Sequence, residues 1–426
     1  MLSDTCLVDQ QETAPSTRAP DVDESGRAMS PPRSISDRAT TRAFVLRVLA
    51  VVYLCRLFSV TLLTIVSRYQ APVAWTGPHP NYFSMTVLWD GTWYRQIAEV
   101  GYPAVLPVDA TTGAVQQNAW AFYPAFPMMS RFLMKVTGLG FPVVGSTLAL
   151  FLGFGAAVIM ALLLRDRVGP AVALAAVAVY AACPMSPSFQ IAYAESLSIL
   201  LLCGFLWALS KERWLVTAVL ALLIGLTRSI ALPLLVVALV AVFLRWRRRQ
   251  RDPITQREGW SALVALGSAG AAGLVWPAIV GVVVGSPTAY TETLGSWAVG
   301  GSVKLLRPWL QYVAQPWNAV QVALVLVIIV AMTVGPWAAG LGIELRTWVL
   351  AYTGYLILVD TPMTSIFRHF LPLFPLTVVL IGGGWRDRHP RWKEWRTGFL
   401  VVLGLAGQVW WVWALLRFVP PSDWPP

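Results

Sequence analysis

Residues 44–67 have the sequence FVLRVLAVVYLCRLFSVTLLTIVS, an apolar run whose only charged residues are Arg47 and Arg56. A helix needs about 20 such residues to cross the hydrocarbon core of a bilayer. The run is too long and starts too late for a signal peptide, so we interpret it as a signal anchor. Residues 1–40, rich in Ser, Thr, Pro, Asp and Arg, are expected to form a disordered cytoplasmic tail.

The apolar character extends over the whole chain of 426 residues, of which 57% are hydrophobic and 12% charged. A soluble domain of this length carries about a quarter charged residues. This composition excludes an ordinary cytosolic enzyme, a disordered scaffold and a disulfide-rich secreted module. The four cysteines have no CxxC spacing and predict neither a disulfide framework nor a metal site. We predict an all-α polytopic membrane protein.

Scanning for apolar runs gives eleven candidate spans, and the closeness of the fifth and sixth leaves room for a short re-entrant break. They are 44–67, 141–164, 168–184, 189–209, 213–227, 229–244, 261–285, 317–335, 345–360, 366–384 and 397–417.

The distribution of Lys and Arg predicts the orientation. With the N-terminus in the cytoplasm, 22 of the 32 basic residues fall in cytoplasmic segments and nine in outer ones, with Arg56 inside the first span. This positive-inside bias predicts a cytoplasmic N-terminus and an outer C-terminus. The net charge of +11 is therefore interpreted as a topology signal next to anionic lipid headgroups, not as a nucleic-acid surface.

Polar residues near the predicted spans gather on the outer side, leaving aside the basic cytoplasmic loops. Ionisable groups at membrane depth are costly and usually face a polar cavity, so several on one face indicate a site. They are Asp90, Glu99, Glu195, Arg228, Asp360, Arg368 and His369. Two outer segments, 68–140 and 286–316, are longer than connectors need to be and contain several tryptophans.

The strongest local pattern is WDGTWYRQIAEVGYP, residues 89–103, in which 92–99 are predicted to be helical. Asp90 has two interpretations: a carboxylate that caps the helix, or one that accepts a proton at the water–membrane boundary. Phe122 and Tyr123 either line a lipid-facing groove or form a turn into the second span. Glu195, the sole acid in a long apolar stretch, is expected to have more than a packing role.

The basic residues also have two interpretations. An arginine on this side can bind a phosphate, with His369 as a further donor. Alternatively, the ion pairs Asp360–Arg368 or Glu195–Arg228 stabilise the bundle. Arg56, within the first span, is expected to be a buried structural partner.

These residues resemble the GT-C superfamily of polytopic glycosyltransferases, and within it the PIG-V-like mannosyltransferase group, in an actinobacterial-type form. The resemblance covers about residues 44–385. It rests on Trp89-Asp90-x-x-Trp93-Tyr94-x-x-Ile97-Ala98-x-x-Gly101-Tyr102, Phe122-Tyr123-Pro124, Tyr193-Ala194-Glu195-Ser196, Arg228, and Arg368-His369-Phe370 with Pro372.

The resemblance implies an inverting transfer of mannose from polyprenyl-phosphate-mannose to a glycolipid or glycan hydroxyl outside the cytoplasm, without a covalent sugar–enzyme intermediate. Asp90 would be the general base. Arg228, Arg368 and His369 would bind the donor phosphate, and Glu195 would orient the sugar or hold an arginine. Trp89, Trp93, Tyr94, Glu99, Tyr123 and Tyr193 would support the loop, with Glu99 as a second acid.

This interpretation divides the chain into the tail 1–40, a first span with a catalytic outer loop (41–140), a bundle with the lipid-donor site (141–385), and a basic loop with the last span (386–426). The partners would be the lipid-linked donor, the acceptor and the bilayer, with no nucleic acid. Some GT-C enzymes use a divalent cation, but the scattered outer acids define no metal site. The alternatives are transfer of arabinose or glucose from another polyprenyl phosphate, a polyprenyl-lipid transporter or flippase, and an inactive structural subunit.

Overall fold

The computed structural model describes residues 35–298, 303–383, 392–421 and 425–426. The chain divides into a first unit, residues 1–44, and one compact unit, Val45–Pro426. The first helix, α1 (Ile35–Ser67), already includes residues 35–40, so the predicted disorder is wrong for those six residues. The rest of the predicted tail, and much of the basic loop after 385, lie outside the described residues.

The predicted all-α class is confirmed for the part of the chain that is described, where β-structure is limited to two isolated bridges, Val73 to Gly77 and Val108 to Val115. After α1, the helices are α2 (Tyr82–Thr86), α3 (Asp90–Glu99), α4 (Ala125–Thr137), α5 (Phe141–Val168), α6 (Pro170–Ala182), α7 (Glu195–Ser210), α8 (Trp214–Gly225), α9 (Ala231–Arg248), α10 (Gln256–Val284), α11 (Ala289–Trp297), α12 (Arg307–Val313), α13 (Pro316–Val334), α14 (Gly342–Val359), α15 (Ile366–His369), α16 (Leu376–Leu380) and α17 (Trp392–Trp411). Short 3₁₀ turns follow several of them, and α17 continues into a π turn at Val412–Leu416.

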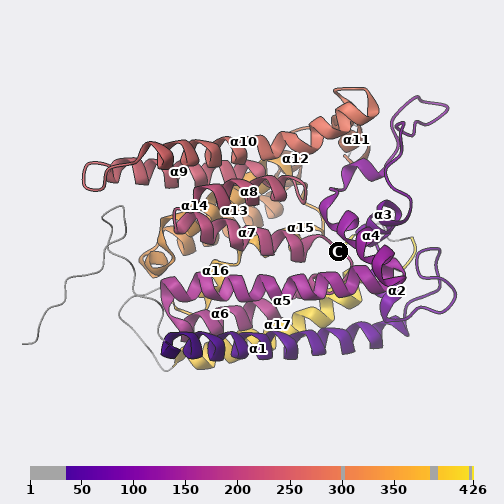
Figure 1. Cartoon of the computed structure of the whole chain (residues 1–426). Helices are drawn as coiled ribbons and strands as arrows, with labels where there is room; N and C mark the ends of the chain where they lie inside the picture. The colour runs from indigo at the N-terminus through magenta and orange to yellow at the C-terminus, as the bar shows by residue number, and fades with distance from the viewer. Residues whose placement is uncertain (1–34, 299–302, 384–391, 422–424) are drawn as a thin grey trace, which may run out of the picture. The chain divides into compact units, whose positions relative to one another are not determined.

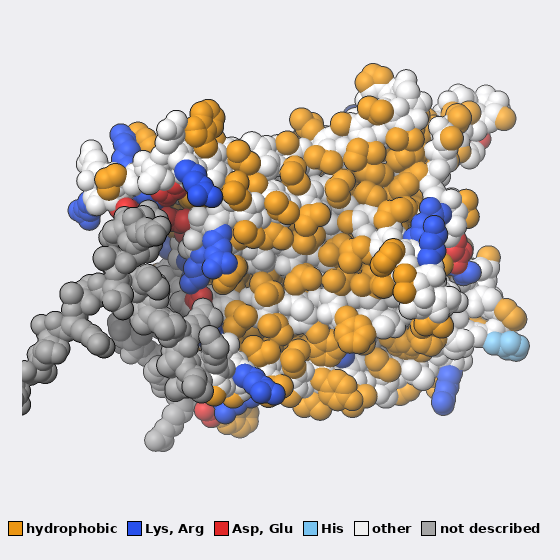
Figure 2. Space-filling model, in the orientation of Figure 1, with side chains coloured by type: hydrophobic (Ala, Val, Ile, Leu, Met, Phe, Trp, Pro, Cys, Tyr) orange, Lys and Arg blue, Asp and Glu red, His pale blue; other side chains and the backbone are white. Residues whose placement is uncertain are grey.

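Five helices of the described chain are long and apolar enough to cross a membrane. These are the helices at Ala39–Ser67, Phe141–Val168, Gln256–Val284, Pro316–Val334 and Glu394–Leu416. Figure 2 shows hydrophobic side chains across the middle of the visible face and basic and acidic side chains toward its ends. A broad apolar band between charged ends is what a membrane protein exposes to lipid.

Three of the remaining predicted spans are short helices. α6, α7 and α8 contain 13, 16 and 12 residues. At 1.5 Å per residue they are about 18–24 Å long, less than the roughly 30 Å of a hydrocarbon core.

Two predicted spans need correction. Residues 366–384 do not form one helix but α15, a 3₁₀ turn at Leu371–Leu373 and α16. Pro372 and Pro375 explain the breaks, because proline has no amide hydrogen to continue a helix. The span predicted at 189–209 begins instead at Glu195, after a 3₁₀ turn at Ser186–Phe189 that contains Pro187. These irregular segments matter because they carry residues of the predicted site.

The helices of the compact unit form a continuous series of neighbours. α7 packs between α5 and α8, α8 packs on α10, and α9 contacts both α10 and α14. Gly225 makes the α8–α10 approach possible, because a Cβ there would lie 2.4 Å from the carbonyl oxygen of Ala272. Figure 1 shows α2, α3, α4 and α11 together near one end of α5 and α10. The predicted long segment 68–140 is therefore a folded layer that contains α2, α3 and α4.

A buried polar network joins α1 to the segment that precedes α7. Arg56 is buried, and its guanidinium donates to the carbonyl oxygens of Ala181, at 2.6 Å, and Ser186 and to the Ser186 hydroxyl at 2.7 Å. Gln408 of α17 donates to that same hydroxyl at 2.9 Å and accepts from Ser59 at 2.8 Å. The prediction that Arg56 is a buried structural partner is confirmed, and its partners are carbonyls near the C-terminus of α6.

We expect Arg56→Ala to lower the free energy of unfolding by about 2 kcal/mol, because buried carbonyls lose charge-assisted hydrogen bonds. Thermal unfolding in detergent, with the exposed Arg68→Ala as the control, measures this effect. Equal unfolding temperatures for the two variants would contradict a structural role for Arg56.

Candidate functional site

Asp90 is positioned by a strained turn. Trp89 has φ 57° and ψ −121°, a conformation that glycine adopts far more easily than tryptophan, and the amide of Gly91 donates to the carbonyl of Leu88 at 3.1 Å. Such strain costs about 1–3 kcal/mol and persists only where the surroundings enforce it. The helix begins at Asp90, not at 92 as predicted, and no side-chain hydrogen bond caps it. The capping interpretation of Asp90 is therefore wrong.

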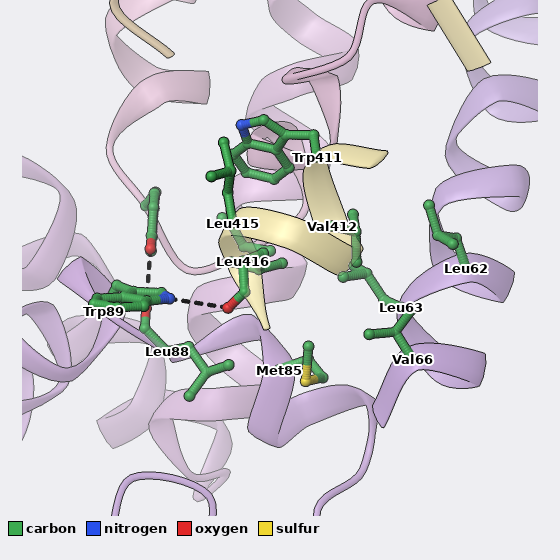
Figure 3. Packing of buried hydrophobic residues seen from close by; sticks show 12 residues of the cluster. Leu62, Leu63, Val66, Met85, Leu88, Trp89, Trp411, Val412, Leu415 and Leu416 are labelled. Carbon is green, nitrogen blue, oxygen red and sulfur yellow. Dashed lines mark hydrogen bonds between the residues drawn. The ribbon is translucent and has the colours of Figure 1, made fainter. Parts of the chain in front are cut away.

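The contacts of the Trp89 side chain hold this strained backbone in place. Its indole Nε1 donates to the carbonyl of Leu416 at 2.9 Å, a hydrogen bond drawn in Figure 3. The ring is packed in a buried cluster with residues of α1, α2, the segments that precede α3 and α7, and the end of α17 with its π turn. These are Leu62, Leu63, Val66, Met85, Leu88, Ile191, Tyr193, Trp411, Val412, Leu415 and Leu416. Trp89 is thus a structural anchor that fixes the start of α3.

Arg368 brings the two predicted acids together. Its Nη1 lies 2.9 Å from Asp90 Oδ2 and 2.8 Å from Glu195 Oε1. Arg228, in the turn between α8 and α9, donates its Nη1 to the same Glu195 oxygen at 2.9 Å. Four residues from four parts of the sequence therefore form one ion-pair chain, Asp90–Arg368–Glu195–Arg228, which we call the charge chain.

Burial divides the charge chain into an inner and an outer part. The side chains of Glu195 and Arg368 are 4% and 3% exposed, whereas Asp90 and Arg228 are 28% and 26% exposed. The two ends can reach a substrate, while the middle holds them in place. The predicted Glu195–Arg228 pair is confirmed, as is the prediction that Glu195 holds an arginine.

The other predicted pair is wrong. Asp360 binds the Nδ1 of His369, not Arg368, and its second oxygen accepts from the amide of Thr361 at 2.9 Å. Asp360 follows the last residue of α14, and His369 ends the single turn of α15. Because His369 is adjacent to Arg368, this pair fixes the segment that carries Arg368.

Two tyrosines complete the buried side of the charge chain. Tyr193 is fully buried, its ring lies 4.8 Å from the Arg368 guanidinium carbon, and its hydroxyl donates to Leu88 at 3.0 Å. Tyr94 of α3 is also buried. Burial, with a further contribution from the Glu195 carboxylate, raises the pKa of Tyr94 well above its usual range. Tyr94 therefore stays neutral.

Other predicted residues lie outside the charge chain. Glu99, at the opposite end of α3 from Asp90, pairs with Arg95 at 2.9 Å on an exposed surface. It is not paired with Arg368; the acid that shares Arg368 with Asp90 is Glu195.

Trp93 and Tyr123 contribute to aromatic clusters instead. Trp93 contacts Phe122 and Trp297, and the Tyr123 hydroxyl lies 2.9 Å from that of Tyr290. α4 separates the Phe122–Tyr123 segment from α5, so the prediction of a turn into the second span is wrong.

An apolar cavity of about 560 Å³ adjoins the Arg368 segment, and the sequence analysis did not identify it. Its walls come from α12, α13, α14 and residues 362–370, and include Trp309, Val325, Leu356, Thr364 and Phe367. Thr364 also donates to the carbonyl oxygen of Pro425, and Arg368 donates to a main-chain oxygen of Pro426. Periodicity does not reveal this cavity, because its walls combine residues from four separate segments.

Within the described ranges, no group of three or more His, Cys, Asp or Glu side chains is placed to hold a metal ion. Comparison with protein-family models and with curated proteins finds no match to this chain. The class defined by the fold and the site is thus an all-helical membrane protein with a buried ion-pair chain beside an apolar cavity.

We expect Glu195→Gln to lower the free energy of unfolding by about 3 kcal/mol, because it leaves two guanidinium groups without their shared carboxylate. Asp90→Asn should cost less than about 1 kcal/mol, since Asp90 is partly exposed. Chemical denaturation of both variants in the same detergent compares them. Equal losses of unfolding free energy in the two variants would show that the buried acid is no more important for stability than the partly exposed one.

Proposed function

We propose that this chain is an integral-membrane inverting mannosyltransferase of the GT-C type. It moves mannose from polyprenyl-phosphate-mannose to a hydroxyl of an extracytoplasmic glycolipid or glycan. The proposal includes about eleven transmembrane segments, a cytoplasmic N-terminus, and an active site on the outer side of the plasma membrane. The observation that carries it is an accessible carboxylate, Asp90, held by a buried arginine next to a lipid-sized apolar cavity.

Asp90 suits the role of general base. Arg368 binds its Oδ2, which fixes the carboxylate, and we assign proton transfer to Oδ1. The acceptor hydroxyl gives its proton to Oδ1 while its oxygen bonds to the anomeric carbon of mannose. The bond from that carbon to the phosphate oxygen breaks, and the electron pair leaves with the polyprenyl phosphate. Attack opposite to the leaving group inverts the anomeric centre.

Arg228 suits the role of first contact for the donor phosphate. It is the more exposed of the two arginines and binds Glu195 through Nη1, so other guanidinium N–H groups can face an anion. A cation held there before the reaction stabilises the charge that grows on the leaving phosphate. Arg368 is more deeply buried and acts mainly by positioning Asp90 and Glu195.

The apolar cavity suits the polyprenyl chain of the donor. It is lined almost entirely by hydrophobic side chains, and Thr364 and Phe367 in its wall belong to the same segment as Arg368. A lipid in this cavity would have its phosphate end near the arginines. A transferase of polyprenyl-phosphate arabinose or glucose would have the same features, so the sugar is decided by assay.

The position of the charge chain also bears on the transporter alternative. Asp90 and Glu195 are the first residues of α3 and α7, and Arg228 lies between α8 and α9. A transporter typically binds its substrate near the membrane midplane, where both sides have access to it. Charges at helix ends favour the transferase.

We expect Asp90→Asn to reduce mannosyl transfer by at least about 100-fold, because general-base catalysis contributes about 10²–10⁴. The assay follows radiolabelled mannose from polyprenyl-phosphate-mannose into a native glycolipid extract in membranes. Glu99→Gln is the matched control, and its rate should stay close to that of the unmodified protein. Equal transfer by both variants would remove Asp90 from the mechanism. Absence of transfer by the unmodified protein would reject the donor or the enzyme class, and lipid translocation would then be assayed.

The cavity gives a second test. Val325→Trp places a bulky ring in its wall and should raise the KM for a long-chain donor several-fold while leaving a donor with a two-isoprenoid chain unaffected. A change that is equal for both chain lengths would indicate that the lipid lies elsewhere.

A further inference from the structure

Three aromatic rings from distant parts of the sequence meet at α3, the helix that begins at Asp90. Trp93 lies on α3, Phe122 precedes α4, and Trp297 ends α11. The Trp93 and Phe122 rings are stacked, with centroids 5.7 Å apart and planes 12° apart. Trp297 meets both rings edge to face, with centroid separations of 5.3 and 5.6 Å. We call these three residues the aromatic platform.

The aromatic platform differs from the neighbouring aromatic cluster in its exposure. In that cluster, Trp120 and Trp276 are almost fully buried and form part of the core. In the platform, Trp297 is 36% exposed, and Trp93 and Phe122 are only partly buried. Packing alone does not require aromatic rings to remain accessible, and exposed apolar patches commonly mark binding sites.

The aromatic platform is also close to the proposed base. Trp93 is three residues after Asp90 on the same helix, so the two side chains are neighbours on one face of α3. Asp90 is accessible as well. A ligand that covers the rings therefore has its edge next to the carboxylate.

A sugar ring matches this combination of an aromatic surface and an acid. One face of a pyranose presents C–H groups, which pack against the negative face of an aromatic ring. Its hydroxyl groups project from the edge of the ring, where a carboxylate can accept a proton. A simple lipid alcohol has no such flat face.

We propose that Trp93, Phe122 and Trp297 form an acceptor subsite that binds a pyranose ring and directs one of its hydroxyls to Asp90. This inference rests on the proposed function and assigns the residues that bind the sugar ring of the acceptor. Trp297 contributes the most exposed surface, while Trp93 links the platform to the base.

The experiment measures Trp297→Ala and Trp297→Phe with octyl mannopyranoside as the acceptor and polyprenyl-phosphate-mannose as the donor. We expect Trp297→Ala to raise the acceptor KM by about tenfold, as the loss of one aromatic contact implies. Trp297→Phe keeps an aromatic ring, so its acceptor KM should lie between that of the unmodified protein and that of Trp297→Ala. The donor KM and the slow hydrolysis of the donor by water should not change. Trp260→Ala, at the start of α10, is the control for loss of an exposed tryptophan.

The outcomes separate the two proposals. Transfer with an unchanged acceptor KM in Trp297→Ala would overturn the subsite alone. If Trp297→Ala loses both donor hydrolysis and transfer, the subsite is also overturned, because Trp297 would then be supporting α3. If the unmodified protein neither transfers nor hydrolyses, the proposed function fails. Saturation-transfer NMR with methyl mannopyranoside then tests the subsite by itself: binding that Trp297→Ala abolishes supports it, and absence of binding overturns it.

Discussion

The cost of burying Arg368 governs the organisation of the site. A guanidinium with only 3% of its side chain exposed needs negative partners, and it obtains them from Asp90 and Glu195 at 2.9 and 2.8 Å. These acids begin two helices, α3 and α7, so satisfying one charge fixes two helix starts relative to α15. Arg228 then balances the charge that Glu195 adds. The accessible ends of the charge chain are held by its buried middle.

Backbone strain at Trp89 also helps to position Asp90. A turn with φ 57° at a tryptophan is unfavourable, yet the indole is anchored by the Leu416 carbonyl and by a buried cluster that includes Leu63 and Trp411. The anchor offsets a cost of about 1–3 kcal/mol and places Asp90 at the first position of α3. The packing of Trp89 in the core thus fixes the position of the Asp90 carboxylate.

Two surfaces of different chemistry share segments with the charge chain: the cavity wall includes residues on both sides of Arg368, and the aromatic platform includes Trp93 of α3, the helix that begins at Asp90. The apolar cavity between α12, α13 and α14 suits a lipid chain, whereas the aromatic platform on α3 and α11 suits a sugar ring. A transferase that joins a lipid-linked sugar to a hydroxyl needs one surface of each kind, with a base and a cation between them. In the proposed function, the partly exposed Asp90 would be that base and the partly exposed Arg228 that cation.

The sequence by itself determined the helical membrane class and most helix positions. In lipid, the backbone N–H and C=O groups of an apolar run must bond to each other, and a helix does this within the run itself. It also identified Asp90, Glu195, Arg228, Arg368 and Arg56, since charges in apolar surroundings are costly. It did not predict that Asp90 pairs with Arg368, that Glu99 lies apart, or that 366–384 is broken. The break in 366–384 is local and follows from Pro372 and Pro375, but the Asp90–Arg368 contact joins residues that are 278 positions apart and lie 2.9 Å from each other. Only tertiary packing decides such contacts, because side-chain distances between helices are not encoded in local periodicity.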